Sequence, residues 1–168
     1  MKKTDLLWAL AYPIYQTIGT IRHEAGHALV AWLQSARITE FVFFPGRHGE
    51  IFYWGYVNWQ GEITWTSLAG PYILDLLTFA VFFLICYKLP FKRHWLWLNL
   101  VIVGMISPLA NSAYAYIRSF SASTNDVIRL LAALPAWPVH LYFIATLALY
   151  AIGLVLVFRR SRHILAAD

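Results

Sequence analysis

Residues 6–34 read LLWALAYPIYQTIGTIRHEAGHALVAWLQ, a long apolar run that carries a His-Glu-x-x-His pattern near its end. As a helix this run would be about 43 Å long at about 1.5 Å per residue, which exceeds the roughly 30 Å hydrocarbon core of a bilayer. The stretch therefore predicts a membrane-spanning helix. Charged groups inside a bilayer cost free energy, so the ionisable residues within this span indicate a functional role.

Three further apolar stretches are long enough to cross a bilayer: residues 68–89, 95–117 and 139–158. The composition agrees, since 60% of the residues are hydrophobic and only 12% are charged, about half the share in soluble domains. We therefore expect a mainly α-helical, polytopic membrane protein with about four transmembrane helices, folded as a single membrane-embedded domain over residues 1–168. This composition excludes a disordered chain and a basic nucleic-acid-binding module.

Basic residues at the ends of these spans predict an orientation. With four spans, one side of the membrane carries Lys2, Lys3, Lys88, Lys92, Arg93, Arg159, Arg160 and Arg162. The other side carries Arg37, Arg47, Arg118 and Arg129. Cytoplasmic segments are enriched in Lys and Arg. The side with eight such residues, compared with four on the other, is therefore predicted to be cytoplasmic, which gives an integral, multi-pass protein with both termini in the cytoplasm.

Between the first two spans, residues 38–66 change character. The runs ITEFVFF, EIFYWGYVN and EITWT are rich in β-branched and aromatic residues and are separated by glycine-containing turns. We expect a small membrane-associated antiparallel sheet here. It either packs as a cap over the helix ends or offers an edge strand, around Tyr56 and Val57, that pairs with an extended peptide.

The sharpest motif is His23-Glu24-Ala25-Gly26-His27. Two His at positions i and i+4 lie on one helix face, so both imidazoles can reach one metal ion. Glu24 then stands where its carboxylate can take a proton from water, whose pKa zinc lowers to about 7. The spacing predicts that His23 and His27 bind Zn²⁺ and that Glu24 is a general base.

A catalytic zinc site usually has three protein ligands, so one more must come from elsewhere. Asp126 is the first choice, at the start of a short helix predicted over 126–134; helix capping is its alternative role. Asp75, inside the second span, and His140, at the start of the fourth, are weaker choices. Asp75 would otherwise pair with Arg22 or a hydroxyl group, and His140 would be an interfacial residue.

Two amides near these residues are candidate hydrogen-bond donors to a developing oxyanion. Asn111 lies near the end of the third span and Asn125 precedes Asp126. Either amide would alternatively bond to the backbone groups that Pro108 leaves without a partner.

The motif in its membrane span, the aromatic sheet, Ser67-Leu68-Ala69-Gly70-Pro71 and the later Asn125-Asp126-Val127 together resemble the site-2 protease family. These are intramembrane zinc metalloproteases of the M50 class. The resemblance covers about residues 15–135 and implies Asp126 as the third zinc ligand and Gly70 and Pro71 as a substrate-binding segment. The chain departs from the family where Leu74 replaces a frequent Asn and Val127 a frequent Gly, and it has no PDZ module.

The resemblance implies a minimal-core metalloendopeptidase that hydrolyses a peptide bond in or near a transmembrane segment, with a transmembrane protein as substrate and the bilayer as its environment. Two alternatives stay open. One is a non-proteolytic, regulatory membrane protein that keeps a metal site, against which the intact Glu24 argues. The other is a membrane hydrolase that acts on a lipid or a small amide.

Overall fold

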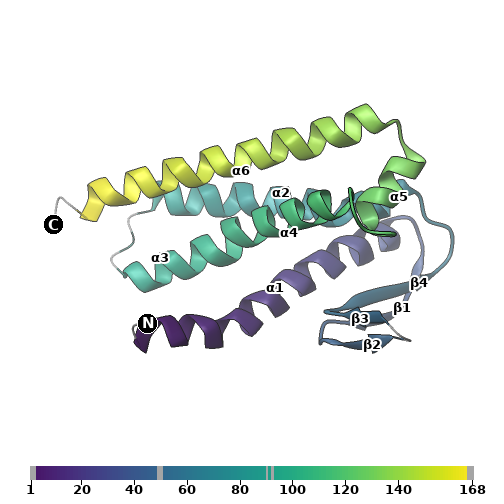
Figure 1. Ribbon diagram of the computed structural model, residues 1–168, viewed down its shortest axis with the longest axis horizontal. Coiled ribbons are helices and arrows are strands. Elements are labelled where there is room, and N and C mark those ends of the chain that lie inside the picture. Colours follow the sequence, from purple (N-terminus) through teal and green to yellow (C-terminus); the bar gives the residue numbers. More distant parts are fainter. Residues whose placement is uncertain (1–2, 49–50, 90, 92, 166–168) are drawn as a thin grey trace. The chain divides into compact units, whose positions relative to one another are not determined.

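The computed structural model describes residues 3–48, 51–89, 91 and 93–165 (Figure 1). Most of these residues are helical, as predicted, and the chain divides into two compact units, Met1–Pro71 and Tyr72–Asp168.

The first unit begins with helix α1 (Lys3–Leu33), which contains the predicted first span. Its C-terminus is closed by Ser35 in the left-handed region, with φ of 65°. Beyond Ser35, the amide of Ala36 donates to the carbonyl of Ala31 at 3.0 Å, which satisfies one of the last helical carbonyls. This sharp stop turns the chain into the strands that follow.

The predicted sheet region forms two separate two-stranded antiparallel sheets, β1 with β4 and β2 with β3. The strands are β1 (Arg37–Val42), β2 (Gly46–His48), β3 (Ile51–Tyr53) and β4 (Tyr56–Gln60). Residues 49 and 50, which belong to the predicted sheet, lie outside the described residues.

The expectation of a further strand at EITWT, residues 62–66, is wrong, because Trp65 already begins helix α2. The cause is a set of helix-start hydrogen bonds that outweighs the β-propensity of this segment. Gln34, at the end of α1, accepts from the amide of Thr64 at 2.8 Å and donates to the hydroxyls of Thr64 and Thr66. The hydroxyl of Ser67 donates to the carbonyl of Thr64 at 2.9 Å.

The remaining helices are α2 (Trp65–Lys88), α3 (His94–Val101), the π-helix η1 (Ile102–Ile106), α4 (Ser107–Arg118), α5 (Asp126–Ala133) and α6 (Ala136–Leu165). Among the described residues, three helical stretches are long and apolar enough to cross a membrane: Trp65–Lys88, Trp95–Arg118 and Ala136–Ser161. They match the second, third and fourth predicted spans. Helix α1 is long but is not one of these three stretches, so the count of four spans stays a prediction.

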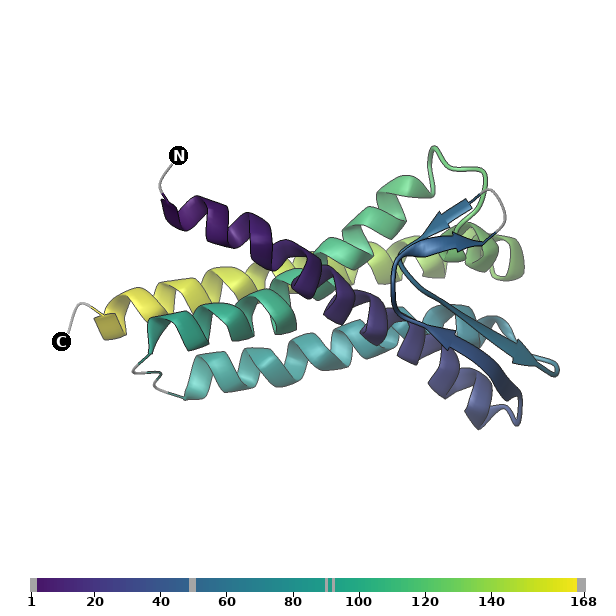
Figure 2. The same cartoon turned by 90° about the horizontal axis from the view of Figure 1, so that it is seen from below.

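In the second unit, α2, α4 and α6 run lengthwise (Figure 2). The core of this unit is a cluster of seven buried side chains from α2, α3, η1 and α6: Phe79, Cys86, Trp97, Val101, Met105, Tyr150 and Val157. The π-helix brings Gly104 against the ring of Phe82, where a β-carbon would overlap the ring atoms. A glycine is therefore required for α2 to approach η1 this closely.

Candidate metal centre

The two motif histidines occupy one face of α1. The rings of His23 and His27 are 5.0 Å apart between centroids and nearly perpendicular, at 85°. Each offers a ring nitrogen, and these atoms lie within 4.8 Å of one another. Glu24 is on the same turn and only 9% exposed, so its carboxylate is largely shielded from water. This local geometry places two nitrogen donors and one base together, as the helical spacing predicts.

A buried hydrogen bond orients His27. Its Nδ1 lies 2.8 Å from the backbone carbonyl oxygen of Ser67. Because a carbonyl only accepts, Nδ1 carries the proton, and a neutral His27 then has its lone pair on Nε2. Metal-binding histidines generally donate their second ring N–H in this way, which fixes the tautomer and the ring direction. The ring of Trp59 on β4 lies 6.3 Å away between centroids.

Small residues let the helix backbones meet at this point. A β-carbon on Gly26 would lie 2.5 Å from Cα of Pro71 and 2.9 Å from the carbonyl carbon of Gly70, so the start of α2 packs directly on the motif. Gly70 in turn faces the carbonyl of Gly26. Such contacts between small residues are typical of closely packed membrane helices. Gly70 and Pro71, predicted to bind substrate, are thus buried against α1, and this packing brings the Ser67 carbonyl to His27.

Asp126 is the first residue of α5 in the second unit. The preceding Asn125 is the N-cap, and its side-chain oxygen accepts from the amide of Ile128 at 2.8 Å. Its side-chain nitrogen donates to the carbonyl of Ala115, in the last turn of α4, at 3.0 Å. Asn125 therefore joins α5 to α4 and sets the position of the neighbouring aspartate. A hydrogen bond from Asn125 to an oxyanion stays a prediction.

Asp75 and Asn111 form a hydrogen-bonded pair between α2 and α4. Asn111 on α4 donates to Oδ2 of Asp75 on α2 at 2.7 Å, and Asp75 is 0% exposed. This bond gives the carboxylate inside an apolar span a hydrogen-bonding partner. We did not infer the pair from sequence, although two polar residues inside separate spans are a signal for it. His140 Nδ1 shares a hydrogen bond with the hydroxyl of Tyr116 at 3.0 Å.

Strand β4 carries the residues predicted to bind an extended peptide. The Tyr56 hydroxyl donates to Oε1 of Glu40 at 2.8 Å, and Asn58 donates to Oε2 of the same carboxylate at 2.9 Å. The pKa of Tyr56 is raised above its usual value, first by the hydrogen bond to Glu40 and then by desolvation and the Glu40 charge. Tyr56 is therefore neutral at physiological pH. Val57 is buried, at 8% exposure.

The model of one protein family, described as Peptidase M50B-like, matches residues 6–167. The chain belongs to this family. The resemblance to M50-class proteases seen in the sequence is thereby confirmed over both units. Neither a curated protein nor a solved structure matches the chain. Together with the three span-capable helices, this membership makes the chain an integral membrane protein of a peptidase family.

The M50B-like chain has residues that fit a metal ion. A buried histidine that donates Nδ1–H to a carbonyl presents Nε2 as a ligand, and the neighbouring turn supplies a second imidazole. Imidazole and carboxylate donors suit Zn²⁺. Sequence alone identified both histidines, but nothing in it indicated the Ser67 carbonyl, because a backbone acceptor has no side-chain signature.

Proposed function

We propose that this M50B-like protein is an intramembrane zinc metalloendopeptidase that hydrolyses a peptide bond in or near a transmembrane segment of its substrate. The observation that carries the proposal is the buried bond from His27 Nδ1 to the Ser67 carbonyl at 2.8 Å. A histidine held in this tautomer, next to a second histidine and a shielded glutamate, supports a metal site with a general base. Membership of a peptidase family supports hydrolysis as its use.

In this proposal His23, His27 and Asp126 are the metal ligands, a set of two imidazoles and one carboxylate. When bound, zinc would acidify water and polarise the scissile carbonyl. Glu24 would accept the proton from the attacking water and pass it to the leaving amine. Asn125 would hold Asp126 in place through its two backbone hydrogen bonds. Both units would then act as one catalytic domain.

Metal content tests the ligand set. Purified protein is expected to carry about one zinc per chain, and His23→Ala and His27→Ala are expected to lose it. Asp126→Ala should weaken zinc binding far more than Asp75→Asn or His140→Ala, because Asp75 already accepts from Asn111 and His140 bonds to Tyr116. The measurement is zinc affinity by competition with a chelator.

Zinc affinity that falls with Asp75→Asn and is unchanged in Asp126→Ala would overturn this ranking. Ser123→Ala, an exposed residue of the loop before Asn125, is the matched control and should bind zinc normally.

We also propose that α1 is a fourth span, with both termini in the cytoplasm. The cation count supports this orientation, although Lys2 and Lys92 lie outside the described residues. Single cysteines at Gly46 and Ser161, in a Cys86→Ser background, should label from opposite faces of the membrane. Gly46 suits this purpose because a β-carbon there meets no atom within 4 Å. Labelling of both positions from the same face would reject four spans.

We propose that the open edge of β4 pairs with the unwound substrate. A substrate helix must unwind because its peptide bonds are shielded, and an edge strand accepts an extended chain through main-chain bonds. β4 pairs only with β1 among the described strands, which leaves its other edge open to such pairing.

Single prolines at Tyr56 and Val57 test this pairing. Neighbouring residues of a strand direct their amides to opposite edges, so one proline removes a bond to β1 and the other a donor at the open edge. We expect the open-edge variant to melt like the wild type, keep its zinc and cleave more slowly. Melting temperature, zinc content and a cleavage time course separate the two variants. Normal cleavage by a folded open-edge variant would remove strand capture from the mechanism.

A further inference from the structure

One end of the second unit gathers cations from α2, from α6 and from the N-cap of α3. The guanidinium of Arg160 on α6 lies 4.8 Å above the ring centre of Tyr87 on α2, next to Lys88. Phe158, next to Arg159, contacts Trp97 of α3 edge-to-face with centroids 5.3 Å apart. The segment of α6 around Phe158 and Arg160 therefore packs on the end of α2 and on α3. We call this group the cationic end; its members are Lys88, Arg93, Arg159 and Arg160, all exposed.

The unit offers these cations no nearby carboxylate among its described residues. Between Asp75 and Asp126 the sequence contains no Asp or Glu, and after Asp126 the next is Asp168, outside the described residues. Lys88 lies 13 residues after Asp75 on one helix, a separation of about 20 Å. Asp126 begins α5, which follows the C-terminal end of α4, whereas α3 precedes the N-terminal end of the same helical stretch. The like charges at the cationic end thus repel one another without an acidic partner within the described unit.

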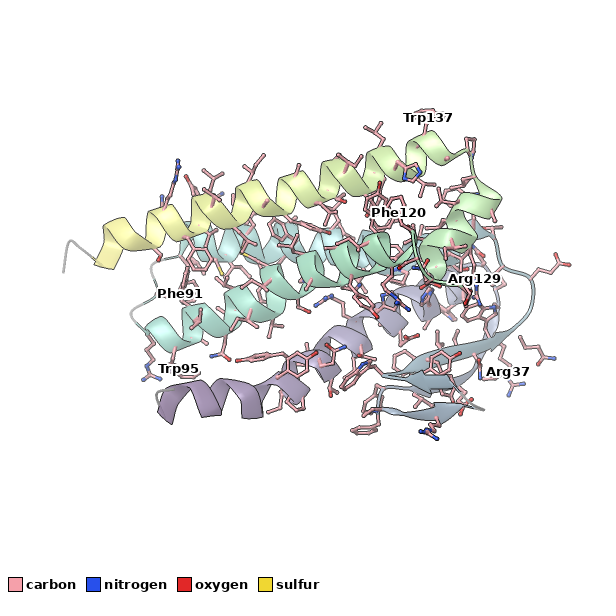
Figure 3. All side chains as sticks on the ribbon, viewed as in Figure 1. Arg37, Phe91, Trp95, Phe120, Arg129 and Trp137 are labelled. Carbon is pink, nitrogen blue, oxygen red and sulfur yellow. The ribbon has the colours of Figure 1, made fainter. Side chains whose placement is uncertain are left out.

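Aromatic residues flank the cationic end, as they do at the ends of membrane-spanning helices. Figure 3 shows Phe91 and Trp95 at this end of the unit and Phe120, Arg129 and Trp137 at the other. Trp95 is 61% exposed and begins one of the span-capable stretches. Exposed Trp residues at the ends of spans sit at the membrane–water interface, where phospholipid phosphates also lie.

We propose that the cationic end binds the headgroup phosphate of an anionic phospholipid. A phosphate diester supplies the negative charge that the described residues at this end do not provide, and the planar guanidinium of Arg160 can donate two N–H bonds to it. The Tyr87 ring holds this guanidinium in place, which lowers the ordering cost of binding. The lipid's acyl chains would lie along the apolar faces of α2 and α6. The site is independent of the proposed metal centre.

The test uses the full chain in detergent, titrated with phosphatidylglycerol or phosphatidylcholine while its melting temperature is followed. The double variant Lys88→Gln/Arg160→Gln is compared with Arg118→Gln/Arg129→Gln, which removes two cations at the opposite end. Phosphatidylglycerol should stabilise the wild type and this control more than phosphatidylcholine does. The Lys88/Arg160 variant should bind phosphatidylglycerol about 30-fold more weakly, from about a fivefold loss for each of the two cations.

A second double variant, Arg93→Gln/Arg159→Gln, leaves the Tyr87 contact intact and should also weaken phosphatidylglycerol binding. It replaces the first variant in the test if that one folds poorly. Equal weakening in the opposite-end control, or no preference for phosphatidylglycerol in the wild type, would overturn the proposal. Competition by inorganic phosphate at the concentrations that suffice for the lipid would show a free-phosphate site instead and would also overturn it.

Discussion

Glu24→Gln is expected to abolish cleavage while the protein keeps its zinc and its melting temperature. The substitution keeps the size of the side chain, but an amide cannot take the proton from water. Loss of a general base typically costs about 10²- to 10⁴-fold in rate. Because Glu24 is only 9% exposed, bulk water is a poor replacement for the missing base. Single-turnover cleavage of a reconstituted transmembrane substrate measures the effect, and zinc content is measured on the same sample.

Glu62→Gln is the matched control, since Glu62 is an exposed carboxylate in the loop between β4 and α2. It should cleave at the wild-type rate. Retained cleavage in Glu24→Gln would refute the base assignment, and loss of zinc from this variant would make Glu24 a ligand instead. Stoichiometric zinc together with no cleavage of peptide, amide or lipid substrates by the wild type would favour a metal-binding protein without turnover.

Gly26→Ala is expected to destabilise the protein and weaken zinc binding, although residue 26 is not a proposed ligand. The new β-carbon would lie 2.5 Å from Cα of Pro71 and 2.6 Å from its nitrogen, both backbone atoms that cannot rotate away. The start of α2 must then move from α1, which lengthens the bond from His27 to Ser67. Overpacking of this kind costs about 1–3 kcal/mol.

The sign of this effect is informative because helix propensity predicts the opposite. Replacing Gly by Ala inside a helix favours folding by about 1 kcal/mol when nothing else changes. A raised melting temperature with normal zinc affinity would therefore show that α1 and α2 do not pack this closely. Gly46→Ala is the control, because its β-carbon meets no atom within 4 Å and the variant should melt within a few degrees of the wild type.

The local features of this protein could be predicted from sequence because each depends on residues close together in the chain. The length of an apolar run is enough to predict a span, and the spacing of His23 and His27 is enough to place both on one face of α1. Asp126 was predicted to open a short helix for the same reason, since an Asn N-cap and an apolar periodicity are local signals. Its role as a zinc ligand stays a prediction.

The features that pair distant residues were decided only by the tertiary structure. Residues 62–66 have strand propensity, but Gln34 bonds Thr64 and Thr66 from the end of α1 and a helix begins there instead. The His27–Ser67 bond spans 40 positions and the Asp75–Asn111 bond spans 36. No pattern of neighbouring residues encodes such contacts, because they form only when separate helices pack. The metal motif is thus local, whereas the orientation of His27 depends on how closely Gly26 lets α2 approach.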